Sequence, residues 1–382
     1  MLSKELFKNY IFPVATLAGS IIGVGIFSLP YVALKSGIWL IMLYLVILTA
    51  IVVLLNTIVG EVAIKTPDFK RIPGFIGFHL GKWAEALSLA TAIFGGLGVL
   101  LVYLIIGSGF FLNALQPSLG GNYLIYVFIY FALALFFIYF DIRAISKFEL
   151  GSILLLVLTM IIIFIKGFSN LKLGNVFAVS SGFNFNNIFL PYGPIIFSLW
   201  GIGLIPEVEE MLGNPSTGSG QGKKNMKKII AVSAIIPAVI YLLFIILILA
   251  ITGNSTTESA LVGLKNVLGG WVSYFALLAG AIVVFNAFIS LGLVLKKVFM
   301  YDIGVKKIQA IIIVCFAPLV LFLLGLRSFI PIISFVGGVF IGIDGILILL
   351  MYKKIGGKNY IIYPLSAVFA LGIIYQIWFL KF

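Results

Sequence analysis

Three glycines and a proline interrupt the first long apolar stretch of the chain, the segment 19–30 with the sequence GSIIGVGIFSLP. Glycine weakens a helix and proline removes a backbone donor, so we expect the helix to unwind here, near mid-membrane. Unwound backbone persists at that depth only where it is buried in protein or lines a cavity, because lipid offers no hydrogen-bond partners. The free N–H and C=O groups of such a break can hold a small zwitterion or an ion, as in a transporter.

A second break is predicted in the apolar stretch that contains Gly201, Gly203 and Pro206. The N-terminal end of a broken half-helix carries about half a positive charge and free N–H groups, which suit a carboxylate. The C-terminal end of the preceding half offers carbonyls to an ammonium group or a cation. Close helix packing is the alternative role for such glycines. The predicted substrate-binding residues are Gly19, Ser20, Ile22, Gly23, Val24, Gly25, Phe197, Trp200, Gly201 and Gly203.

The composition is that of an integral membrane protein, since 62% of the 382 residues are apolar and 10% are charged. Apolar runs of membrane length recur along the chain, so the first is interpreted as a span rather than a cleaved signal peptide. The predicted fold class is therefore all-α. Eleven transmembrane helices are expected, at 10–34, 38–64, 83–113, 122–140, 149–166, 188–212, 228–252, 267–298, 308–326, 329–352 and 360–380.

The net charge of +13 follows the expected topology. Most lysines and arginines fall in alternate connections between the spans, which predicts a cytoplasmic N-terminus, an extracytoplasmic C-terminus and a location in the cell membrane. Orientation explains this charge better than a nucleic-acid-binding surface does. The lone Cys315 excludes an internal disulfide and a cysteine cluster, and the lone His79 argues against a metal site in the protein.

The two breaks lie in matching places of the two halves of the chain, which indicates an internal repeat. Five spans separate them, and because five is odd the second unit enters the membrane with the opposite orientation. Spans 1–5 and 6–10 are therefore interpreted as inverted repeats with discontinuous helices 1 and 6. The transport core is expected to cover residues 1–352, and residues 353–382 to form a peripheral eleventh span.

The residues at the two breaks also resemble a known family. The segment 19–31 is similar to the first-span motif of the amino acid/auxin permease family, which belongs to the amino acid–polyamine–organocation superfamily with the leucine-transporter fold. Segments 190–193 and 198–210 resemble the sixth span of that family, and 290–293 resembles its tryptophan/tyrosine permease branch. Weaker likenesses lie at 60–62, 66–67 and 71–74.

The resemblance implies a secondary transporter that works by alternating access, in which Trp200 is an aromatic gate over the substrate. Neither span 1 nor the upstream half of span 6 carries an acidic residue beside its break. A site built from backbone groups suits the two charged poles of an α-amino acid. We therefore expect a neutral L-amino acid as the substrate, carried by an ion-coupled symporter.

Acidic residues at membrane depth are the candidates for proton coupling, because they are costly there and usually functional. These candidates are Asp344, Glu207 and Glu61; the dipole of a helix that starts at Pro206 offers Glu207 a structural role instead. The superfamily resemblance implies a sodium alternative that joins carbonyls of span 1 to polar side chains of span 8. Both ions stay open, with protons favoured. The possible sodium ligands are Gly19, Ile22, Asn286 and Ser290.

Other functions fit the sequence less well. A polyamine transporter of the same fold would need anionic side chains in the cavity, and a membrane sensor would need a partner-binding tail. An intramembrane enzyme would need a catalytic pair, a metal cluster or a phosphate loop, none of which the sequence contains. No cofactor other than the coupling ion is expected. The expected partners are an amino acid and membrane lipid, without nucleic acid, and the sequence leaves the oligomeric state open.

Overall fold

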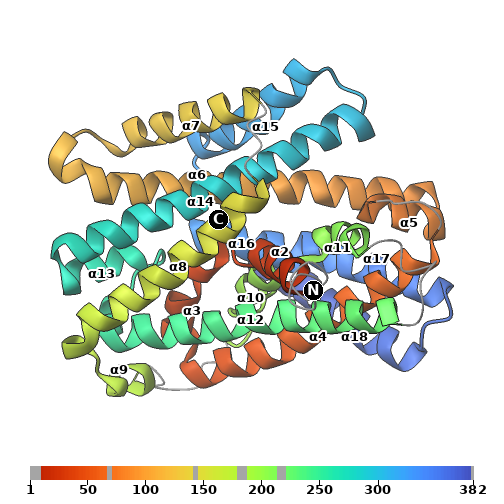
Figure 1. The fold of residues 1–382 in the computed structure, drawn as a ribbon, viewed down its shortest axis with the longest axis horizontal. Helices are drawn as coiled ribbons and strands as arrows, with labels where there is room; N and C mark the ends of the chain where they lie inside the picture. Colours follow the sequence, from red (N-terminus) through yellow and green to blue (C-terminus); the bar gives the residue numbers. More distant parts are fainter. Residues whose placement is uncertain (1–9, 67–70, 141–144, 179–186, 213–220, 380–382) are drawn as a thin grey trace, which may run out of the picture.

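The computed structural model describes residues 10–66, 71–140, 145–178, 187–212 and 221–379. These residues form helices and turns without a strand, which confirms the predicted all-α class. The long helices run side by side along the longest axis of the molecule (Figure 1). Within the described ranges, seven helical stretches are long and apolar enough to cross a membrane, and four further apolar helices are shorter. The expected total of eleven spans remains a prediction.

The helices follow the predicted spans closely, because long apolar runs leave the backbone no partner except itself. The longest are α4 (Ile38–Lys65), α6 (Lys82–Leu119), α8 (Ile145–Gly167), α12 (Gln221–Thr252), α14 (Gly270–Lys297) and α18 (Asn359–Phe379). The shorter apolar helices are α2 (Phe12–Ile21), α3 (Leu29–Ser36), α7 (Tyr123–Tyr139), α10 (Tyr192–Leu199), α11 (Ile205–Met211) and α15 (Lys307–Leu323).

Three short helices lie in the connections between the predicted spans. They are α5 (Ile72–Leu80), α9 (Leu173–Ala178) and α13 (Leu261–Leu268). Helix α5 lies at one end of the bundle, and α9 and α13 lie at the other (Figure 1). Helix α5 has Pro73 in its first turn, and it ends before Gly81, whose φ of 92° stops the helix.

Both predicted breaks are present. In the first, α2 ends at Ile21, Ile22 and Gly23 are extended, and a short 3₁₀ turn, η2 (Val24–Phe27), leads into α3. In the second, α10 ends at Leu199, and Trp200 and Gly201 lead through a 3₁₀ turn into α11. We call Ile22–Gly23 the first break and Trp200–Gly201 the second break. Helices 1 and 6 are therefore discontinuous, as the glycines and prolines predicted.

The two breaks pack against each other in a reciprocal way. A Cβ atom on Gly25 would lie 2.9 Å from the Cβ and 3.0 Å from the Cα of Ser198, next to the second break. A Cβ atom on Gly201 would lie 3.0 Å from Cδ1 of Ile21, next to the first break. Each glycine thus makes room for a residue at the end of the half-helix that leads into the other break. This contact is the close packing that glycine permits between membrane helices.

Span 10 contains an irregularity that the sequence did not predict. Helix α16 (Phe329–Phe335) and helix α17 (Ile341–Lys354) are joined by a π-helical turn, η8 (Val336–Phe340). This turn packs against α10, where a Cβ atom on Gly337 would lie 3.0 Å from the carbonyl carbon of Gly193. Turns of this kind occur inside helices mostly at functional sites. Here the turn brings span 10 to the first half of span 6.

The reciprocal packing predicts unequal costs for alanine at the three glycines of the breaks. Gly25→Ala places its methyl group against backbone and is expected to destabilise the protein by about 1–3 kcal/mol. Gly201→Ala meets a flexible isoleucine side chain and should cost less. Gly203→Ala is the control, because no atom lies within 4 Å of its Cβ position. Melting temperatures in detergent test this order, and a Gly25→Ala protein as stable as the parent would contradict the contact between the breaks.

Candidate functional site

Two tyrosines from neighbouring helices reach the point where the breaks meet. The hydroxyl of Tyr241, on α12, lies 2.7 Å from the carbonyl oxygen of Ile21 and 2.8 Å from that of Ser198. The hydroxyl of Tyr103, on α6, lies 3.5 Å from the position of a Cβ atom on Gly23. Four helices therefore contribute to one junction, and we call it the break junction: Ile21, Gly23, Tyr103, Ser198 and Tyr241.

Open space at the break junction is uneven among the predicted glycines. Among the described residues, Gly23 has only the Tyr103 hydroxyl within 4 Å of its Cβ position, and Gly203 has no atom within that distance. The space at the Cβ positions of Gly25 and Gly201 is occupied by residues beside the opposite break, and Gly19 lies against Ile153 of α8. Gly23 and Gly203 thus offer backbone to a ligand, whereas the others serve packing. The packing role had been the alternative for all of them.

The electrostatics of the first break follow from its helix ends. The first N–H groups of a helix and the last carbonyls have no partner within it, and the helix dipole adds partial charges of matching sign. Helix α2 presents its carbonyl end at Ile21, and η2 presents N–H groups from Val24 onward. A negative pole and a positive pole therefore flank the two extended residues Ile22 and Gly23, so the first break offers opposite partial charges to a ligand that carries both signs.

Side chains at the breaks divide into those already bonded and those free to meet a ligand. The Ser20 hydroxyl donates to the Leu17 carbonyl at 2.8 Å, and the Ser198 hydroxyl donates to the Pro194 carbonyl at 2.7 Å. Ile22 and Val24 are buried in the core. Phe197 and Trp200 are only partly buried, so their rings remain accessible beside the second break.

The sequence prediction missed both tyrosines of the break junction. Tyr103 and Tyr241 stand alone in apolar spans, and nothing in their spacing links them to breaks in other spans of the sequence. One signal was present, because a phenol in a membrane span has to find a hydrogen-bond partner. In Tyr241 that partner is the broken backbone, and its side chain is fully buried.

Asp344 forms a polar cluster with α6, away from any basic partner. Its carboxyl oxygen lies 2.6 Å from the Thr91 hydroxyl, and Ser88 also hydrogen-bonds to it. The Thr91 hydroxyl lies 2.8 Å from the Ser88 carbonyl as well. Because the Thr91 hydroxyl has one proton, it can donate a hydrogen bond to an ionised Asp344, or donate to the Ser88 carbonyl and accept a hydrogen bond from a neutral Asp344. The cluster accommodates both protonation states.

The other proton candidates lie in different settings. Glu61 forms an ion pair with Lys227, at 2.7 Å between Oε1 and Nζ. The side chain of Glu207 lies outside the described residues, although its backbone belongs to α11. Its neighbour Glu209 is buried. Of the candidates, only Asp344 has hydroxyl partners on another span in the described part of the protein.

The residues predicted for sodium lie around α8. Gly19 lies against Ile153, and the Asn286 side-chain amide donates to the hydroxyl of the adjacent Ser152 at 3.2 Å. Ser290 is partly buried one turn further along α14. The amide of Asn286 is thus engaged by span 5. Within the described ranges, no group of three His, Cys, Asp or Glu residues could hold a metal ion.

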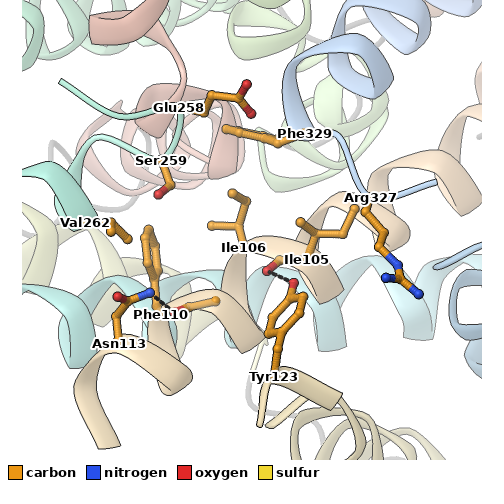
Figure 2. Close-up of a pocket in the computed structure, with 11 residues that line it drawn as sticks. Ile105, Ile106, Phe110, Asn113, Tyr123, Glu258, Ser259, Val262, Arg327 and Phe329 are labelled. Carbon is orange, nitrogen blue, oxygen red and sulfur yellow. Dashed lines mark hydrogen bonds between the residues drawn. The ribbon is translucent and has the colours of Figure 1, made fainter. Parts of the chain in front are cut away.

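A cavity of about 250 Å³ opens at the end of the bundle that holds α13 (Figures 1 and 2). Phe110 lines it, and the ring of Phe110 packs edge-on against Phe27 of η2, with 5.1 Å between centroids. Phe27 also packs against Phe244 of α12. All three rings are buried, and they form a chain of contacts from the cavity wall at Phe110 to η2, which follows the first break.

Two groups of opposite charge line this cavity. Figure 2 shows Glu258 and Arg327 on different sides of it. Burial raises the pKa of the Glu258 carboxyl. The Arg327 guanidinium donates from Nε to the Phe322 carbonyl at 3.3 Å and lies over the Phe322 ring. The cavity therefore presents a carboxyl and a guanidinium to solutes that enter from this end.

Solved structures with the same fold are transporters. A manganese transporter mutant of Eremococcus coleocola is similar with a TM-score of 0.69 and 10% identity, over 98% of this chain and 86% of that one. The same transporter in complex with an aromatic bis-isothiourea substituted compound gives a TM-score of 0.65 and 12% identity, over 98% and 88%. MhsT in complex with L-phenylalanine gives 0.58 and 16%, over 96% and 98%. The chain thus has the leucine-transporter fold.

Comparison with curated proteins gave no match. A family model does match, and it covers residues 12–341, which is most of the chain and includes both breaks. Its description is "Transmembrane amino acid transporter protein". The protein is thus an integral membrane transporter rather than an enzyme. The chain belongs to the transmembrane amino acid transporter protein family.

Proposed function

We propose that the protein is a secondary active symporter that carries neutral L-amino acids across the cell membrane by alternating access. The break junction is the observation that carries this proposal. It brings helix-end carbonyls, free N–H groups and a phenol to one point inside the bundle. The membership of the family supports amino acids as the class of substrate.

The substrate's two charged groups are assigned to the backbone of the first break. The carboxylate is received by the N–H group of Val24, at the start of η2, and by the Tyr103 hydroxyl, which lies beside Gly23. The ammonium group faces the carbonyl ends of the two upstream half-helices. Segments 16–30 and 192–204 contain no Asp or Glu, so no acidic side chain there would hold a second positive charge. A neutral side chain is therefore favoured, with Phe197 and Trp200 as its neighbours.

Alternating access is assigned to movement of the half-helices about the breaks. The Phe27, Phe110 and Phe244 rings close the break junction on the side of the cavity beside α13. By the distribution of lysine and arginine, this side is extracytoplasmic and the N-terminus is cytoplasmic. Opening requires the rings to part, so that the cavity becomes continuous with the break junction.

Protons are the proposed coupling ion, and Asp344 the residue that carries them. Its cluster with Thr91 and Ser88 can hydrogen-bond to either protonation state, so a proton can be gained or lost without an unpaired group. Neither of the two ion pairs in the described part of the protein includes Asp344. Sodium at Gly19, Ile22, Asn286 and Ser290 remains the alternative.

Uptake into proteoliposomes tests the function itself. A mixture of labelled neutral amino acids is supplied under an imposed proton gradient and, separately, under an imposed sodium gradient. We expect accumulation under the proton gradient. Accumulation under sodium alone would reject the proposed ion, and polyamine uptake would reject the substrate class. Binding detected by thermal shift without accumulation under either gradient would favour a sensor.

Removal of one hydroxyl tests the carboxylate site. Tyr103→Phe is expected to raise the KM for uptake about tenfold or more, because a hydrogen bond to a charged group contributes about 1.5–3 kcal/mol. Tyr126→Phe is the control, since that hydroxyl bonds to the Gly120 carbonyl at the end of α6. An unchanged KM in Tyr103→Phe would remove Tyr103 from the site.

Asp344→Asn tests the proton carrier. This variant keeps the shape of the side chain but cannot ionise, so uptake should lose its pH dependence and at least about nine-tenths of the rate driven by the proton gradient. Glu61→Gln is the matched control at the Lys227 ion pair, and it should keep the pH profile of the parent. If Asp344→Asn retains the pH profile and Glu61→Gln loses it, the assignment is wrong.

A further inference from the structure

The Tyr241 hydroxyl has two strong acceptors and one proton. The carbonyl oxygens of Ile21 and Ser198 lie 2.7 and 2.8 Å from it, and the backbone of Gly23 also hydrogen-bonds to the phenol. A phenol can donate one hydrogen bond fully. Two carbonyls from two different broken helices therefore converge on a single proton in a fully buried position.

Both carbonyls lack a hydrogen-bond partner within their own helix because the helices break. In an unbroken helix the Ile21 carbonyl would accept from residue 25 and the Ser198 carbonyl from residue 202. The breaks at Ile22–Gly23 and Trp200–Gly201 remove both bonds. Each oxygen is also at the negative end of its half-helix. The hydroxyl proton of Tyr241 thus carries the partial positive charge that meets the carbonyl ends of both α2 and α10.

In transporters with discontinuous helices, carbonyls of unwound backbone and of half-helix ends are the ligands that hold a coupling cation. We propose that the Tyr241 hydroxyl stands in for such a cation at the break junction. It holds the two carbonyl ends together permanently, and no sodium ion is needed there. Tyr241 is therefore a positioning residue, since it acts on the substrate site through the backbone of Ile21, Gly23 and Ser198.

The geometry deepens the proposed function, and it rests on the proposal that the break junction is the transport site. A permanent hydroxyl would fix the closed spacing of the two half-helices in every ion condition. Its removal leaves two carbonyls without a donor, around a space the size of a hydroxyl group. Unpaired buried carbonyls are costly, so a small cation becomes favourable at that point.

The test is the melting temperature of the purified protein without substrate, in sodium chloride and in choline chloride of equal concentration. This readout needs no transport, so its outcome is separate from that of the uptake assay. Tyr241→Phe removes only the hydroxyl. Tyr241→Asn makes more room and adds an amide oxygen as a possible ligand. Tyr130→Phe is the control, because Tyr130 is a buried phenol whose hydroxyl has no hydrogen-bond partner among the described residues.

We expect Tyr241→Phe to melt lower than the parent in choline, and to gain about 2 °C when sodium replaces choline, beyond any gain of the parent. Tyr241→Asn should gain more, and it provides the measurement if Tyr241→Phe does not fold. Tyr130→Phe should respond to sodium as the parent does. Equal melting of the Tyr241 variants in sodium and choline, relative to the parent, would overturn the inference. A parent-like melting temperature of Tyr241→Phe in choline would overturn it too.

Discussion

Lipid cannot hydrogen-bond to a protein backbone, and the rest of this structure depends on that constraint. Two helices give up their internal hydrogen bonds at Ile22–Gly23 and Trp200–Gly201, inside an apolar bundle. They can do so because the breaks face each other and share partners. Ser198 fills the space at Gly25, Ile21 fills the space at Gly201, and Tyr241 supplies a donor to both carbonyl ends. Neither break would be stable in isolation.

This arrangement separates the structural and chemical roles of the breaks. Gly25 and Gly201 are required for contact, so their backbone is enclosed, whereas Gly23 and Gly203 border open space. A ligand therefore meets a short stretch of backbone held in place by tightly packed neighbours. Such a site uses few charged side chains, which are costly at this depth. In the proposed function, such a site lets an apolar protein recognise a molecule that carries two full charges.

Much of this architecture could be predicted from the sequence. The breaks lie where Gly23 and Gly201 had placed them, because glycine and proline act locally on the helix. The different roles of the glycines could not be predicted, since they depend on which residue of the other half lies opposite. Tyr103 and Tyr241 were missed for the same reason. The π-helical turn at 336–340 also has no local signal beyond its glycines, and it follows from packing against α10.

That turn has a mechanical consequence. Gly337 and Gly193 bring the backbones of span 10 and the first half of span 6 into direct contact, and Ser334 lies against Gly193 as well. Close-packed backbones resist sliding past each other, so span 10 and the first half of span 6 are expected to move together as one rigid unit. Asp344 lies about two helical turns beyond Gly337 in that unit. In the proposed transport cycle, a change in how α6 holds Asp344 would therefore be transmitted to α10, the half-helix that ends at the second break.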